Sequence, residues 1–314
     1  MHARTLALLA GVLALCCLGY LTLGARAGWD FILPFRAPKL AALLLVGASV
    51  STATVLFQTI TNNRLLTPAI MGFDWLYVLL ITATVYMIGG FALADLPPLL
   101  VFGLTSLIMV AASLLLFGTL LLETRQDLIR MILTGVILSG LFRAGNGLLQ
   151  RMIDPNEFSV IQVASYARFN AIDTDILPVA ALLTLLALAA AWQMRHRLDV
   201  LSLGRDAAIN LGEDPRRGYL QVLVVVAVLV SVSTAFVGPV VFLGLIVAAI
   251  AHVLTPVPYH AVLLPCAALV SMITLVGGQT ILERVLQLST PLSVIVDVVG
   301  GAVFILLLLG SLRP

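Results

Sequence analysis

The sequence has 314 residues, of which 61% are hydrophobic and 10% are charged, with a mean hydropathy of +1.14 and a formal net charge of +2 at pH 7. A soluble domain needs charged residues on every solvent-facing surface, so this composition excludes a soluble protein, and no basic patch suggests nucleic-acid binding. In a membrane only helix bundles and closed β-barrels pair every backbone polar group. Barrel strands alternate polar and apolar residues, whereas residues 222–230 are apolar throughout, so we expect helices.

Uncharged stretches between charged residues mark the expected membrane-spanning helices. The longest lies between Arg217 and Glu283, where 65 residues contain no Asp, Glu, Lys or Arg. About 20 apolar residues cross a bilayer as one helix, so this stretch holds three spans, with turns expected at Gly238 and at residues 255–258. We therefore predict an all-α, polytopic membrane helix bundle of about ten transmembrane helices, in a single domain over residues 1–314. The predicted helices cover residues 5–23, 38–60, 71–92, 97–121, 128–150, 177–193, 218–237, 240–254, 260–282 and 291–312.

The distribution of basic residues predicts the orientation of the bundle. Cytoplasmic loops carry an excess of Lys and Arg. Most of the 17 Lys and Arg residues fall on the cytoplasmic side if the N-terminus is cytoplasmic, so we expect both termini there. Arg36, Lys39 and Arg284 then fall at outer helix ends. Such residues either extend to the membrane interface as anchors or serve in recognition.

Two charged residues, Asp297 and Arg143, lie inside predicted spans. Ionisable residues within a membrane are costly and are functional candidates. Asp297 could line a transport pathway, carry protons, or accept hydrogen bonds as a purely structural residue, and Arg143 could lie nearer a membrane interface. No Ser-His-Asp group, carboxylate pair or metal-ligand spacing is present, so we expect no catalytic residue, no metal site and no cofactor.

The inner loop at about residues 194–217 is polar and patterned. Gly204 and Gly212 are natural helix terminators and Pro215 prevents continuation, so two short amphipathic helices fit between them. Short amphipathic helices can lie on lipid or dock into a groove of a partner. The alternative is a solvated connector.

This loop also carries a resemblance to a known family. Residues 201–212, LSLGRDAAINLG, resemble the coupling-helix segment of the bacterial iron-chelate and cobalamin permeases (the FecCD family, BtuC-like). Further segments resemble motifs of that family in the same order: RAPK at 36–39, NRLLTPAIMG at 63–72, GPVVFLGLIV at 238–247 and PLSVIVDVVGGAVF at 291–304. Together these segments extend the resemblance from about residue 30 to the end.

The chain departs from the family pattern at several positions. TNNRLLTP at 61–68 is similar to the ferric-siderophore branch, so the resemblance favours a siderophore over cobalamin. The departures are Lys39 for an arginine, Arg64 for a proline, Ala248-Ala249 for Pro-His, and Asp297 and Ala302 for the threonine and proline of the cobalamin permease.

The resemblance implies a permease subunit of an ATP-driven ABC importer that moves a ferric siderophore across the bacterial inner membrane. Lys39 is the only lysine and no GxxxxGK[ST] motif is present, so ATP hydrolysis requires a separate chain. The implied partners are a second permease, identical or homologous, two cytoplasmic ATP-binding subunits and a periplasmic substrate-binding protein.

The resemblance also implies roles for individual residues. Arg36, Lys39 and Arg284 would dock the binding protein, and Asn63 and Leu65 would form part of the cytoplasmic gate. The residues implied in coupling to the ATPase are Leu201, Leu203, Gly204, Arg205, Ala208, Leu211 and Gly212.

Several alternatives remain open from the sequence. An ion-coupled secondary transporter would need embedded carboxylates near broken helices, for which Asp297 is the candidate. A permease for cobalamin or haem would share the fold. An intramembrane enzyme needs a catalytic cluster at membrane depth, which the sequence does not show, and a membrane scaffold would lack ATP-linked uptake.

Overall fold

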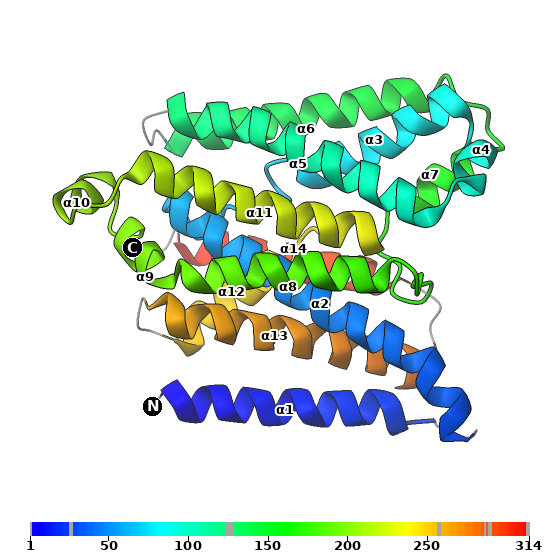
Figure 1. Ribbon diagram of the computed structural model, residues 1–314, viewed down its shortest axis with the longest axis horizontal. Helices are drawn as coiled ribbons and strands as arrows, with labels where there is room; N and C mark the ends of the chain where they lie inside the picture. Colours follow the sequence, from blue (N-terminus) through cyan, green and yellow to red (C-terminus); the bar gives the residue numbers. More distant parts are fainter. Residues whose placement is uncertain are drawn as a thin grey trace.

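The computed structural model describes residues 2–24, 28–123, 128–255, 259–285, 287 and 291–311. Within these ranges all regular secondary structure is helical (Figure 1). The elements are α1 (His2–Thr22), α2 (Trp29–Thr61), α3 (Phe73–Ile88), α4 (Gly90–Asp95), α5 (Pro98–Glu123), α6 (Leu128–Gln150), α7 (Phe158–Ala164), α8 (Leu177–Gln193), α9 (Arg195–Leu201), α10 (Arg205–Asn210), α11 (Pro215–Val237), α12 (Leu243–Leu254), α13 (His260–Thr280), a π-helical turn η1 (Ile281–Val285) and α14 (Leu292–Ser311).

The ten predicted spans each correspond to one helix: α1, α2, α3, α5, α6, α8, α11, α12, α13 and α14. In the described part of the chain, five helices are long and apolar enough to cross a membrane alone, and six if α8 and α9, bent by 58° at their junction, count as one span. Helices α3 and α12 are shorter apolar helices. The predicted all-α membrane bundle is therefore confirmed.

Helix α2 is the centre of the bundle. It packs against α8, α11, α12 and α13, and 72% of its most apolar window is buried, compared with 6% for α1 at the periphery. The side chains of Leu43, Leu56 and Phe57 are completely enclosed. A helix that is apolar on all sides needs such a central position, because each face requires an apolar neighbour.

Helix α2 begins at Trp29, nine residues before the predicted start at residue 38. The later start was predicted because the uncharged stretch begins only after Arg36 and Lys39. Pro34 and Pro38 also lie in this part of the chain, and proline usually ends or kinks a helix. The structure continues the helix through both prolines. Arg36 lies in this first part of α2, and its guanidinium is bonded to the end of α1 as described below, which fixes the segment against its neighbour.

The two ends of the bundle carry different short elements. Figure 1 shows α9 and α10 at the same end as the start of α1, whereas α4, α7 and the start of α2 lie at the opposite end. We call these the α9–α10 end and the α4–α7 end. Positions along each helix can therefore be compared between spans.

Neighbouring glycines of α14 predict a sharp difference in packing. A Cβ on Gly300 would overlap Phe242 and come within 2.9 Å of Ile246 Cδ1, whereas a Cβ on Gly301 would meet nothing within 4 Å. Overpacking of this kind costs about 1–3 kcal/mol. We expect Gly300→Ala to lower the thermal unfolding temperature of the purified protein and Gly301→Ala to leave it unchanged. Equal unfolding temperatures would contradict the contact between α14 and α12.

Candidate functional site

The predicted coupling segment, residues 194–217, forms two short helices as expected, α9 and α10. Leu198, Leu201 and Ala208 are fully buried against the bundle. A Cβ on Gly218 would lie 2.9 Å from Leu201 Cδ1, so the glycine at the start of α11 makes room for α9. Leu201 and Ala208 therefore anchor the segment and are not available for direct contact with a partner.

Three other apolar residues of the coupling segment are exposed. Leu203 and Leu211 are each 62% exposed and Ile209 is 51% exposed. Arg205 is exposed beside them, at the start of α10. Exposed leucines on a short helix pair beyond the membrane spans form an apolar surface of the type that docks into a protein groove.

Glycine and acidic residues set the ends of these helices. Gly212 has a φ of +82°, and the bonds from Gly212 N–H to Ile209 C=O and from Glu213 N–H to Ala208 C=O complete a Schellman motif after α10. The Asp214 side chain caps α11 by accepting from the amides of the next two arginines. The geometry confirms Gly212 as a helix terminator, and Gly204, with φ +92°, separates α9 from α10.

A second constraint comes from Arg197 on α9. Its guanidinium forms an ion pair with Glu213 and donates to Gln221 Oε1 on α11 at 2.6 Å. Together with the buried leucines, these bonds tie the segment to α11. Movement of the exposed leucines must therefore move part of the bundle with them.

The predicted gate residues, Asn63 and Leu65, lie in a turn between α2 and α3, which we call the gate turn (residues 62–72). Asn63 Oδ1 accepts from the Leu65 amide at 2.9 Å, and Gln58 Nε2 donates to the Arg64 carbonyl at 2.5 Å. Asn62, in the left-handed conformation with φ +48°, ends α2. An Asn-led turn braced by its own helix is well defined in shape.

A cavity of about 460 Å³, which we call the inner cavity, lies between the gate turn and the coupling segment. Ligand sites commonly enclose about 300–1,000 Å³. The residues that line it come from α2, the gate turn, Ser202 after α9, the end of α12 and the start of α13. They are Val55, Gln58, Thr59, Asn62, Asn63, Arg64, Ser202, His252, Thr255, His260 and Leu263.

The three residues predicted to dock a binding protein differ in their surroundings. Arg36 is only 6% exposed. Its guanidinium donates to three carbonyls at the C-terminal end of α1, those of Tyr20, Leu21 and Leu23, at 3.1, 2.6 and 3.0 Å. All three bonds come from one nitrogen, Nη1, so the hydrogens on Nη1 are engaged within the chain. The expectation that Arg36 precedes a helix was wrong, because it lies inside α2.

Lys39 and Arg284 are more accessible. Lys39 is half-buried, with its ammonium 4.4 Å from the centre of the Phe35 ring, a cation–π contact. The side chain of Arg284 is 28% exposed, pairs with Glu283 at 3.5 Å and lies next to Gly24, after α1. The structure therefore brings Arg284 and Arg36 to the same helix end.

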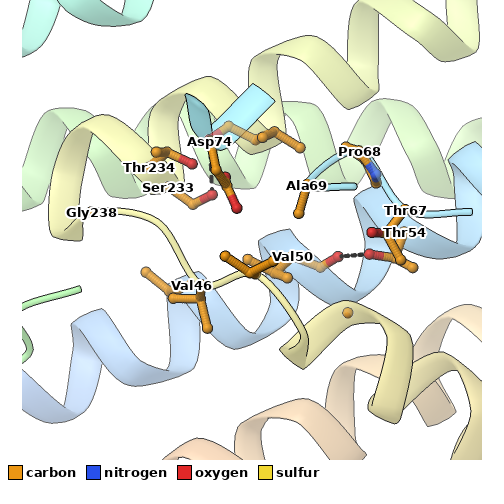
Figure 2. A pocket seen from close by; sticks show the side chains of 14 residues that line it. Val46, Val50, Thr54, Thr67, Pro68, Ala69, Asp74, Ser233, Thr234 and Gly238 are labelled. Carbon is orange, nitrogen blue, oxygen red and sulfur yellow. Dashed lines mark hydrogen bonds between the residues drawn. The ribbon is translucent and has the colours of Figure 1, made fainter. Parts of the chain in front are cut away.

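Two carboxyl groups lie inside the membrane-spanning helices. Asp297 Oδ1 on α14 accepts from the Phe242 amide at 3.1 Å, at the start of α12. Asp74, near the start of α3, is 7% exposed, and among the described residues its Oδ2 has no hydrogen-bond partner. Figure 2 shows Asp74 facing a small cavity beside Ser233 and Thr234 of α11. Sequence reasoning missed Asp74, although it falls in the predicted helix at 71–92.

The contact of Asp297 predicts how substitutions will act. Asp297→Asn keeps an oxygen that accepts from Phe242, so we expect transport and stability to remain near the parent level. Asp297→Ala removes the cap of α12 and should cost about 0.5–2 kcal/mol. Thermal unfolding and uptake of the two variants test this. Complete loss of uptake in a correctly assembled Asp297→Asn protein would instead indicate that the carboxylate carries protons.

Arg143 and the potential metal-binding side chains add no second site to the described part of the chain. Arg143 lies with its guanidinium carbon 5.6 Å from the centre of the Trp75 ring, and its side chain is exposed. In the described ranges no three His, Cys, Asp or Glu side chains are grouped to hold a metal ion. The site is therefore the coupling segment, the gate turn and the cavity between them.

Comparison with known proteins identifies a matching family and several relatives of this chain. The profile of the FecCD transport family matches residues 6–310. The chain is 41% identical over 304 residues to the petrobactin import system permease protein YclO of Bacillus subtilis (strain 168), covering 97% of this chain and 96% of that protein. It is 29% identical to the iron(3+)-hydroxamate import system permease protein FhuG of the same organism, covering 88% of this chain and 82% of that protein.

A solved structure shares the fold. A chain from a protein assigned as a metal-chelate type ABC transporter, in an inward-facing conformation, superposes with a TM-score of 0.81 at 25% identity. The match covers 98% of this chain and 99% of that one. The match to nearly the whole sequence and the shared fold show that this chain belongs to the FecCD transport family.

Proposed function

We propose that this chain is the permease subunit of an ABC importer that carries a ferric siderophore, of the petrobactin type, across the bacterial plasma membrane. The observation that carries the proposal is the coupling segment, which exposes Leu203 and Leu211 on two anchored short helices. The 41% identity with a petrobactin permease supports the choice of cargo. Residues 1–314 act as a single transport domain and perform no covalent chemistry.

The orientation follows from the same segment. The α9–α10 end is the cytoplasmic end, and the start of α1 lies there (Figure 1). Both termini are then cytoplasmic, in agreement with the excess of basic residues on that side. Two ATP-binding subunits attach at this end, one to each of two permeases, and the permeases form the transport path between them.

The gate turn closes the cytoplasmic exit in this proposal. Asn63 lines the inner cavity together with Ser202 of the coupling segment, and Leu65 lies two residues further along the gate turn. The coupling segment and the gate turn therefore line the same cavity, so a shift of the one changes the surroundings of the other. Conformational transitions of this kind generally occur when packed elements shift between two discrete arrangements.

A periplasmic binding protein delivers the siderophore at the α4–α7 end. Lys39 and Arg284 are the contacts we propose for it, whereas Arg36 holds the end of α1 against α2 and acts indirectly. Exposed charges of this kind raise the rate and fix the register of docking more than they raise affinity.

Reversing these two charges tests the docking surface. We expect the Lys39→Glu, Arg284→Glu double variant to bind the purified binding protein more slowly and to reverse the salt dependence, because screening then relieves repulsion. A single exposed pair contributes only about 0–1 kcal/mol, so one substitution should do little. Arg151→Glu, at an exposed arginine following α6, is the control. Identical association rates and salt slopes in all proteins would show that Lys39 and Arg284 are interfacial anchors.

The subunit composition tests the proposed function itself. The chain, expressed with its neighbouring genes and purified in mild detergent, should retain a soluble ATPase and a second permease. A chain that purifies alone under conditions that keep it folded would count against an ABC importer and favour a secondary transporter.

A further inference from the structure

A chain of hydrogen bonds joins the coupling segment to α2 through the first residue of α13. Asp199 of α9 accepts at one oxygen from both the backbone N–H and the ring Nδ1 of His260, each at 2.7 Å. The other ring nitrogen, Nε2, lies 2.8 Å from Thr59 Oγ1 in the last turn of α2. His260 is 98% buried, so few competing bonds to water are available.

The Asp199–His260 joint is firm. A carboxylate only accepts, so Nδ1 carries a proton and donates to Asp199 together with the backbone amide. Two bonds from one residue to one carboxylate fix both the position and the orientation of the imidazole. Breaking them would leave the first backbone amide of α13, at the buried His260, and a partly buried carboxylate without these partners, which is costly. Helix α9 and the start of α13 are therefore expected to move together.

The His260–Thr59 joint is releasable. The Thr59 hydroxyl also lies 2.8 Å from the Val55 carbonyl of its own helix. A hydroxyl has one proton to donate, so Thr59 can donate either to Nε2 or to the Val55 carbonyl. When His260 moves away, Thr59 keeps a bond inside α2. Opening this joint therefore does not leave the Thr59 hydroxyl unpaired.

The gate turn begins next to this joint. The Thr59 carbonyl accepts from the Asn62 amide at 3.3 Å, and Asn62 leads directly into the predicted gate residue Asn63. Thr59, Ser202 and His260 all line the inner cavity, whose 460 Å³ gives the start of α13 room to shift against α2. Packed elements without such a space are not free to slide.

We propose that Asp199, His260 and Thr59 form a relay that transmits movement of the coupling segment to the gate turn, with His260 as the positioning residue. The inference rests on the proposed function and deepens it. When the ATPase displaces α9, the Asp199–His260 unit moves with it, and the contact at Thr59 opens or closes. The gate turn is thereby held in one state and released in the other.

Thr59→Val tests the relay, because it removes only the hydroxyl and keeps the shape of the side chain. Thr61→Val is the matched control: Thr61 is buried in the same turn, and its hydroxyl donates to the Phe57 carbonyl of its own helix. The readout is siderophore transported per ATP hydrolysed by the reconstituted complex. Couplings between sites typically amount to about 5-fold or more. We expect this ratio to fall by about that factor in Thr59→Val and to stay unchanged in Thr61→Val.

Further outcomes separate the relay from the proposed function. Thr59→Ser retains a hydroxyl and should restore the ratio, and a ratio as low as that of Thr59→Val would overturn the relay. Equal ratios in the wild type, Thr59→Val and Thr61→Val would overturn the relay alone. Absence of ATP-dependent uptake by the wild-type complex would overturn the proposed function, and the relay with it.

Discussion

Replacing both Leu203 and Leu211 with Asp is expected to remove the ATPase from the purified complex and to abolish uptake. Each leucine is 62% exposed, so neither substitution disturbs the core of the permease. In the assembled transporter both side chains would enter a groove of the ATPase, where an unpaired charge costs about 3–5 kcal/mol. Each 1.4 kcal/mol lowers affinity about tenfold, so co-purification should be lost.

A charge added beside the same surface provides the control. Asn210→Asp places a negative charge next to Leu211 on an exposed position without removing an apolar side chain. We expect this variant to retain the ATPase. Normal ATPase yield with the double-Asp permease would show that the exposed leucines are not the docking surface.

Replacing Arg36 with Met is expected to destabilise the permease strongly. The substitution retains a long apolar side chain but leaves the carbonyls of Tyr20, Leu21 and Leu23 without their donor. Hydrogen bonds to a charged group contribute about 1.5–3 kcal/mol, so the loss should be roughly 3 kcal/mol or more. Lys39→Met, on the same helix and half-buried, should change stability by about 0.5 kcal/mol or less.

Thermal unfolding of the two Met variants measures this difference, and binding-protein association separates the roles. We expect a large fall in unfolding temperature for Arg36→Met alone. A stable Arg36→Met permease that no longer binds the delivery protein would show that Arg36 belongs to the docking surface and does not hold α1.

Local patterns were sufficient to predict the fold and part of the site. Hydropathy located the ten helices that correspond to the predicted spans, since a bilayer demands long apolar runs, and Gly204, Gly212 and Pro215 marked the two short helices of the coupling segment. The gate and docking residues came from the resemblance, and their roles remain predictions.

Features that depend on tertiary contacts could not be predicted. The outer position of Arg36 suggested exposure, whereas the structure buries it against α1, and α2 continues through two prolines. The relay joins residues separated by 61 and 201 positions in the chain, so no local pattern indicates it. Asp74 lies at the edge of an uncharged stretch, and only the packing of α3 shows that it is buried.

Uptake of ferric petrobactin labelled with radioactive iron, into proteoliposomes that contain the purified complex and its binding protein, distinguishes ATP-driven import from ion-coupled transport. We expect accumulation that requires ATP on the side of the coupling segment and that persists when ionophores collapse the ion gradients. Accumulation that proceeds without ATP and stops when the ion gradients are collapsed would contradict this expectation, and would identify the chain as an ion-coupled transporter.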